Sequence, residues 1–195
     1  MSLLFSLKTT RILKGFCFAV PFMVALTPVQ PGFAATPAQI EQLKNEITPS
    51  VMNSLAGSPD TLNATLAAVV GRARGQGFTS DEIDTGIGEA AGLLVDAAKL
   101  FDAQGAGGLL AVYPQLSGPL NQMSGGNPAS LTAATFDAQI SGMLTAMAAN
   151  MTNPTAAAAL LAVANLVASG QAASISGAAF GAVPAALVQN PASNS

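Results

Sequence analysis

The sequence predicts an all-α protein: a small alanine-rich helical bundle, built as two similar three-helix units joined by a Gly/Pro-rich connector. Short polar residues directly before proline recur along the chain. This pair is typical of helix starts, because the polar side chain caps the first turn and proline fits its first position. Apolar residues between these starts recur every three or four residues. Packing of both units into one continuous domain is the alternative.

Residues 1–34 are predicted to be a signal peptide. A short apolar run covers residues 15–26, and Gly32 and Ala34 place small residues where a signal peptidase cleaves. The run is shorter than the about 20 residues that a membrane-spanning helix needs. We expect cleavage before Ala35, with an uncut membrane anchor as the alternative. The basic residues that precede the run are Lys8, Arg11 and Lys14.

The chain lacks histidine, and its only cysteine, Cys17, lies in the predicted signal peptide. These absences exclude Ser-His and Cys-His nucleophile pairs, the usual zinc ligand sets, and haem held by His or Cys. The sequence also has no phosphate-binding glycine loop. We therefore expect a protein that is not an enzyme and that needs no cofactor.

Residues 35–103 are predicted to form a charged helical unit. Helices are expected to start at Thr36-Pro37, at Ser58-Pro59 and at Thr79, where Glu82 completes a capping box. Cleavage would leave four basic and ten acidic side chains. An acidic chain without a basic stripe argues against nucleic acid as a partner. The apolar stripe of the third helix consists of Ile83, Ile87, Ala90, Leu94, Ala97 and Phe101.

Residues 104–127 are predicted to be the connector between the two units. Six glycines and two prolines lie between Gln104 and Gly126. Glycine and proline at this density are typical of loops. We expect an irregular segment whose apolar stretch, residues 109–113, docks on one of the two units.

Residues 128–188 are predicted to form a charge-poor helical unit, followed by a disordered tail at 189–195. Asp137 is the one charged side chain from Ala103 to Ser195. An average segment of this length would carry about 23. We expect Asp137 to lie near the N-terminal end of its helix, where the dipole favours an acid. The two helix starts in this unit are Asn127-Pro128 and Asn153-Pro154.

A weak internal repeat relates the two units. Alanine-rich helices align with one another by composition alone, so a duplication and a chance similarity both stay open. The pairs matched at an offset of 95 residues include Pro59 with Pro154, Leu66 with Leu161, and Gly75-Gln76 with Gly170-Gln171.

An acidic cluster is the first candidate metal site. Its members, Asp81, Glu82, Asp84 and Glu89, offer the oxygen ligands that Ca²⁺ prefers. The cluster does not fit the EF-hand pattern, because Ile83 and Thr85 stand where oxygen ligands are required. We favour the simpler interpretation, a helix N-terminus that carries acidic residues.

A methionine stripe is the second candidate metal site. Met143, Met147 and Met151 recur every four residues, and thioethers are ligands for Cu(I). Methionine at helical spacing is more often a core residue. The stripe continues the apolar series that begins at Phe136 and Ile140, so we favour a role in the core.

These observations support two hypotheses for function. The first is an exported, non-enzymatic helical protein that associates with copies of itself or with an envelope partner, in the periplasm, on the cell surface or outside the cell. Its basis is the charge-poor half of the chain behind an export signal. The second is a membrane-active protein or a carrier of apolar ligands. Membrane contact stays open, because polar residues interrupt the apolar segments and a basic face is missing.

Overall fold

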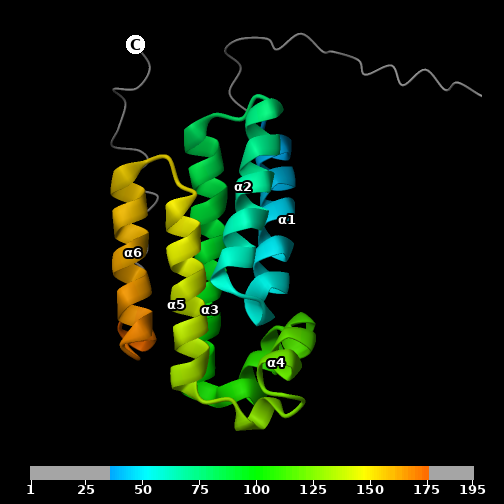
Figure 1. Cartoon of the computed structure of the whole chain (residues 1–195), viewed down its shortest axis with the longest axis vertical. Coiled ribbons are helices and arrows are strands. Elements are labelled where there is room, and N and C mark those ends of the chain that lie inside the picture. Colours follow the sequence, from blue (N-terminus) through cyan, green and yellow to red (C-terminus); the bar gives the residue numbers. More distant parts are fainter. Residues whose placement is uncertain (1–35, 176–195) are drawn as a thin grey trace, which may run out of the picture. The chain divides into compact units, whose positions relative to one another are not determined.

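The computed structural model describes residues 36–175, and these residues form a helical bundle (Figure 1). Within that range 84% of the residues are helical, with six α-helices and no strand. The expected all-α class is confirmed. The predicted signal peptide, residues 176–188 of the charge-poor unit and the predicted tail lie outside the described residues. The α-helices are α1 (Pro37–Asn53), α2 (Pro59–Gly75), α3 (Ser80–Val112), α4 (Ser117–Met123), α5 (Ala133–Ala149) and α6 (Pro154–Ala168); the 3₁₀ turns are η1 (Ser54–Ala56), η2 (Pro114–Leu116), η3 (Pro128–Ser130) and η4 (Ala172–Ser174).

Four of the five predicted helix starts are confirmed. In each of them a side-chain oxygen accepts a hydrogen bond from a backbone N–H of the first turn, which otherwise has no partner in the helix. The Thr79 start is the capping box expected from the sequence, because the Glu82 carboxylate also accepts a 2.8 Å bond from the Thr79 N–H. The four capping residues are Thr36, Ser58, Thr79 and Asn153.

The predicted helix start at Asn127-Pro128 is wrong. Pro128 begins only the short η3 turn, and the Asn127 side chain makes no capping bond. Leu131 then returns to an extended conformation, with φ −71° and ψ 128°. The α-helix begins after Thr132, whose hydroxyl accepts a 3.2 Å bond from the Thr135 N–H. The proline fixed a local turn, but the cap that starts α5 is Thr132, five residues after the predicted cap Asn127.

The predicted irregular connector at 104–127 is largely helical. Helix α3 continues through residues 104–112, and η2 and α4 follow. Gly105 adopts φ 65°, a conformation that favours glycine, and bends α3 at that point. The segment also contributes to the core, because Leu109, Leu116 and Leu120 are buried. Buried leucines stabilise these short helices where composition alone suggested a loop.

Helices from both halves of the sequence share one hydrophobic core within residues 36–175. Helix α5 packs against α6, α3 and α2, whereas α1 packs against α3 and α2. In Figure 1, α5 lies between α6 and α2, with α3 behind it. The described parts of the two predicted units therefore form the alternative arrangement, one continuous bundle.

Burial does not follow the repeat at an offset of 95 residues. Leu66 is fully buried, whereas its match Leu161 is 40% exposed. A shift of one residue rotates a position by about 100° around the helix axis. The buried positions of α2 and α6 instead correspond at an offset of 94: Leu62 with Ala156, Leu66 with Leu160, Val69 with Val163, Val70 with Ala164, and Ala73 with Val167.

Candidate functional site

Asp84, one of the proposed calcium ligands, is fully buried and has a structural role. Its carboxylate accepts bonds from the Thr152 N–H at 3.0 and 3.1 Å and from the Thr152 hydroxyl at 2.9 Å. It also accepts a 2.7 Å bond from the Asn153 N–H. Asp84 on α3 therefore fixes the turn between α5 and α6, and Asn153 in turn caps α6.

The other three acids of the proposed calcium site have roles that differ from that of Asp84. Glu82 belongs to the capping box, Asp81 is exposed in the first turn of α3, and Glu89 forms a 2.8 Å ion pair with Lys44 of α1. The hydrogen bonds that the Lys44 ammonium donates to Glu89 and Glu41 raise its pKa. Within residues 36–175, no three His, Cys, Asp or Glu side chains lie close enough to hold a metal ion.

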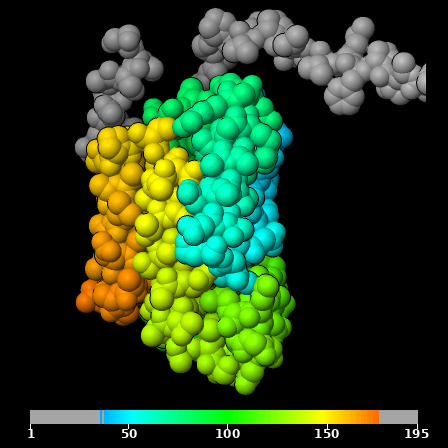
Figure 2. Space-filling model, in the orientation of Figure 1, coloured from blue at the N-terminus to red at the C-terminus, as the bar shows by residue number. Residues whose placement is uncertain are grey.

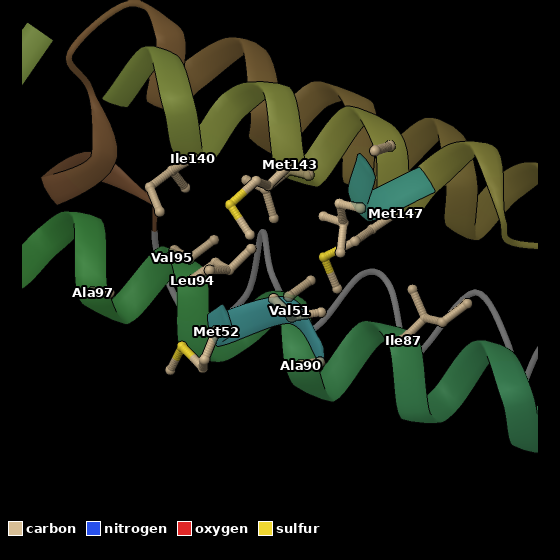
Figure 3. Packing of buried hydrophobic residues seen from close by; sticks show 14 of the residues in the cluster. Val51, Met52, Ile87, Ala90, Leu94, Val95, Ala97, Ile140, Met143 and Met147 are labelled. Atoms are coloured by element: carbon tan, nitrogen blue, oxygen red, sulfur yellow. The ribbon is translucent and has the colours of Figure 1, made fainter. Parts of the chain in front are cut away.

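The methionine stripe is divided by the end of α5. Met143 and Met147 are fully buried and point toward α3, where Ile87, Ala90 and Leu94 face them (Figure 3). Met151 lies beyond the helix, which ends at Ala149, and is only partly buried. The structure therefore places Met143 and Met147 in the hydrophobic core, with Met151 in the turn that follows.

Two amide side chains that the sequence analysis missed join α5 to the first half of the chain. Gln139 Nε2 donates to the carbonyl oxygens of Leu55 at 2.9 Å and Gly57 at 2.7 Å. Asn150 Nδ2 donates to Asn63 Oδ1 of α2 at 2.7 Å. An amide side chain within α5 and another directly after its last residue were the available signal, although their partners lie more than 80 residues away.

Asp137 is buried in the bundle, with only 2% of its surface exposed. It is the fifth residue of α5, so it lies near the N-terminal end, although that end is set by Thr132. Its Oδ1 atom has no hydrogen-bond partner in the described part of the chain. Burial, and to a lesser extent the charge of Asp102, raises the pKa of Asp137 to about 6.

The burial of Asp137 leaves an uncharged surface over the second half of the bundle. Every other charged side chain within residues 36–175 lies between Glu41 and Asp102, on α1, α2 and α3. We call the exposed side chains of α4, α5 and α6 the neutral surface. Figure 2 shows the part of it that α5 and α6 form side by side, in yellow to orange. On α6 its members are Pro154, Thr155, Ala158, Leu161, Ala162, Asn165 and Ala168.

Two further findings bear on the class of this protein. No helix within residues 36–175 combines the length and the apolar character needed to cross a membrane. Comparison of the chain with protein-family models, with curated proteins and with solved structures gave no match.

Proposed function

We propose that this chain is an exported, non-enzymatic helical protein that acts by associating with proteins through the neutral surface. The observation that carries the proposal is the burial of Asp137. Without it, the charge-poor half would present an acid to solvent; with it, the described surface after residue 103 has no charged side chain. The partner is a second copy of the chain or another protein of the cell envelope.

The physical basis is the cost of removing charge from water. The central parts of protein interfaces are depleted of charged residues, because a desolvated charge without a partner is unfavourable. The neutral surface avoids this cost. Small side chains such as Ala158 and Ala162, which flank the exposed Leu161, also let another backbone approach closely. Helices α1 and α3 carry a net negative charge, so they repel a second copy and favour contact through the other half.

Export is part of the proposal and rests on the sequence of residues 1–34. The protein is expected in the periplasm, on the cell surface or outside the cell. A non-enzymatic role follows from the residue types, because the chain lacks histidine and its only cysteine belongs to the export segment. The remaining acids, without a histidine or a second catalytic group nearby, rarely suffice for catalysis.

The test compares matched charge insertions on two helices of the exported protein. Light scattering after size exclusion is expected to show association for the wild type and for Ala64→Glu/Ala68→Glu on α2. Ala158→Glu/Ala162→Glu on α6 should be monomeric. All four alanines are exposed, and each pair lies in the second and third turns of its helix. The two double substitutions therefore change helix propensity and net charge equally.

Three measurements separate the outcomes. Intact mass should match a chain that begins at Ala35; retention of Met1 would contradict cleavage. A wild-type monomer at high concentration that also captures no envelope protein by cross-linking in the producing cells would overturn the association proposal. Co-flotation of the wild type with neutral phosphatidylcholine vesicles would favour the membrane-active alternative instead.

A further inference from the structure

Asp137 lies at a joint between α3 and α5. Its neighbour in sequence, Phe136, stacks on Phe101 of α3 with ring centroids 4.4 Å apart and an angle of 16° between the rings. Asp102 directly follows Phe101 on α3, just as Asp137 directly follows Phe136 on α5, so each stacked ring has an acidic neighbour on its own helix. Three residues beyond Asp102, α3 bends at Gly105. The joint therefore lies next to the bend that leads into η2 and α4.

No cation within residues 36–175 forms an ion pair with Asp137. Helix α6 and η1, which pack on α5, contain no ionisable side chain. Helix α2 contributes an exposed Asp60 in its first turn, and its two arginines, Arg72 and Arg74, are exposed in its last turn. The ion pairs within residues 36–175 join Lys44 to Glu41 and Glu89, and Arg72 to Glu46, so none reaches Asp137.

Helix α3 places a second acid beside Asp137. The charge of Asp102 acts on it, whereas Lys99, one turn earlier on α3, forms no ion pair with another described residue. Glu89 is paired with Lys44, and Asp96 is exposed. Asp81, Glu82 and Asp84 belong to the first turns of α3, at the opposite end of α5, where Asp84 binds Thr152. The charged group that acts on Asp137 is therefore Asp102, whose negative charge repels an ionised Asp137.

We propose that Asp137 is a pH-sensitive latch, in which the neutral carboxyl keeps α3 and α5 closed around the Phe101–Phe136 pair and ionisation opens this end of the bundle. A neutral carboxyl fits the site because it leaves no buried charge unpaired, whereas an ionised one favours conformations that admit water. Opening exposes apolar side chains of the half that already lacks surface charge. This inference is independent of any partner.

The test follows the carboxyl and the opening separately in the purified protein. Carbon-13 NMR of the aspartate carboxyl groups should show Asp137 titrating near pH 6. Hydrogen exchange, corrected for its intrinsic pH dependence, should report opening. Between pH 5 and 7.5 the opening constant of residues 98–109 and 133–141 should rise about tenfold, as linkage of these protonation states requires. The helices α1 and α2 should show no comparable rise.

Two variants identify the group responsible. Asp137→Asn should abolish the pH-dependent opening. Asp102→Asn should retain it with a midpoint at lower pH, because a repelling charge has been removed. Titration of Asp137 below pH 4.5, unchanged exchange across the pH range, or a pH dependence that persists in Asp137→Asn would overturn the proposal. If Asp137→Asn does not fold, the wild-type titration and the direction of the Asp102→Asn shift still decide the question.

Discussion

The Asn153 N–H donates a 2.7 Å hydrogen bond to the buried carboxylate of Asp84, 69 residues earlier in the chain. This bond and the bonds from Thr152 attach the turn before α6 to the second turn of α3. The acid therefore connects the charged half of the sequence to the charge-poor half, in addition to the apolar contacts of α5.

Asp84→Asn should lower the free energy of unfolding by about 3 kcal/mol or more. In this variant an NH₂ group takes the place of one carboxylate oxygen. Because NH₂ is a donor, it cannot accept a hydrogen bond from the Thr152 or Asn153 N–H, and these buried N–H groups lose a charged acceptor. Urea unfolding measures the change. Asp96→Asn on the exposed side of α3 is the control and should stay within about 0.5 kcal/mol of the wild type. Equal stabilities of the two variants would contradict this role for Asp84.

Two glycine-to-alanine changes should have opposite effects on stability. A Cβ atom at Gly142 of α5 would lie 2.8 Å from Pro59 Cγ of α2, so Gly142→Ala forces the helices apart and should destabilise by about 1–3 kcal/mol. A Cβ atom at Gly71 meets nothing within 4 Å. Gly71→Ala should therefore stabilise by about 0.5–1 kcal/mol through helix propensity. Thermal unfolding checks both, and a stabilised Gly142→Ala would disprove the close α2–α5 contact.

Asp137 should make the protein less stable as the pH rises. The folded-state pKa is raised to about 6 from an ordinary 3.8, so the unfolded chain releases this proton first. The stability that the neutral Asp137 carboxyl provides is fully present below pH 4. It is lost between about pH 4 and 6, which lowers the free energy of unfolding by about 3 kcal/mol, and the loss stays constant at higher pH.

Urea unfolding at pH 4, 5, 6 and 7 isolates this contribution when the wild type is compared with Asp137→Asn. The variant should be more stable at pH 7, and its advantage should shrink as the pH falls toward 4. Acids that do not interact with Asp137 contribute equally to both proteins, so the difference reports Asp137 together with its coupling to Asp102. An advantage that stays constant across the pH range would show that Asp137 does not titrate in the folded state as expected.

Sequence patterns predicted those features that depend on near neighbours. A cap such as Thr79 with Glu82 closes over three residues, so its hydrogen bonds can be expected from spacing alone. The apolar stripe from Ile83 to Phe101 likewise follows from helical periodicity, and all six of its members are buried. The scarcity of charge from Ala103 onward, with Asp137 as the one charged side chain, required no structure at all.

The roles of Asp84 and Asp137 depended on residues far away in the sequence. Both acids look alike as members of helix N-terminal segments, yet one receives four hydrogen bonds from the turn before α6 and the other has an unpartnered oxygen. The helices within residues 104–127 likewise depend on tertiary packing, because their leucines are buried in the core. By itself the sequence determined where most helices start and which half lacks charge, because those properties are local. Only the tertiary structure decided which faces are buried and which polar groups meet, because burial depends on how the helices pack.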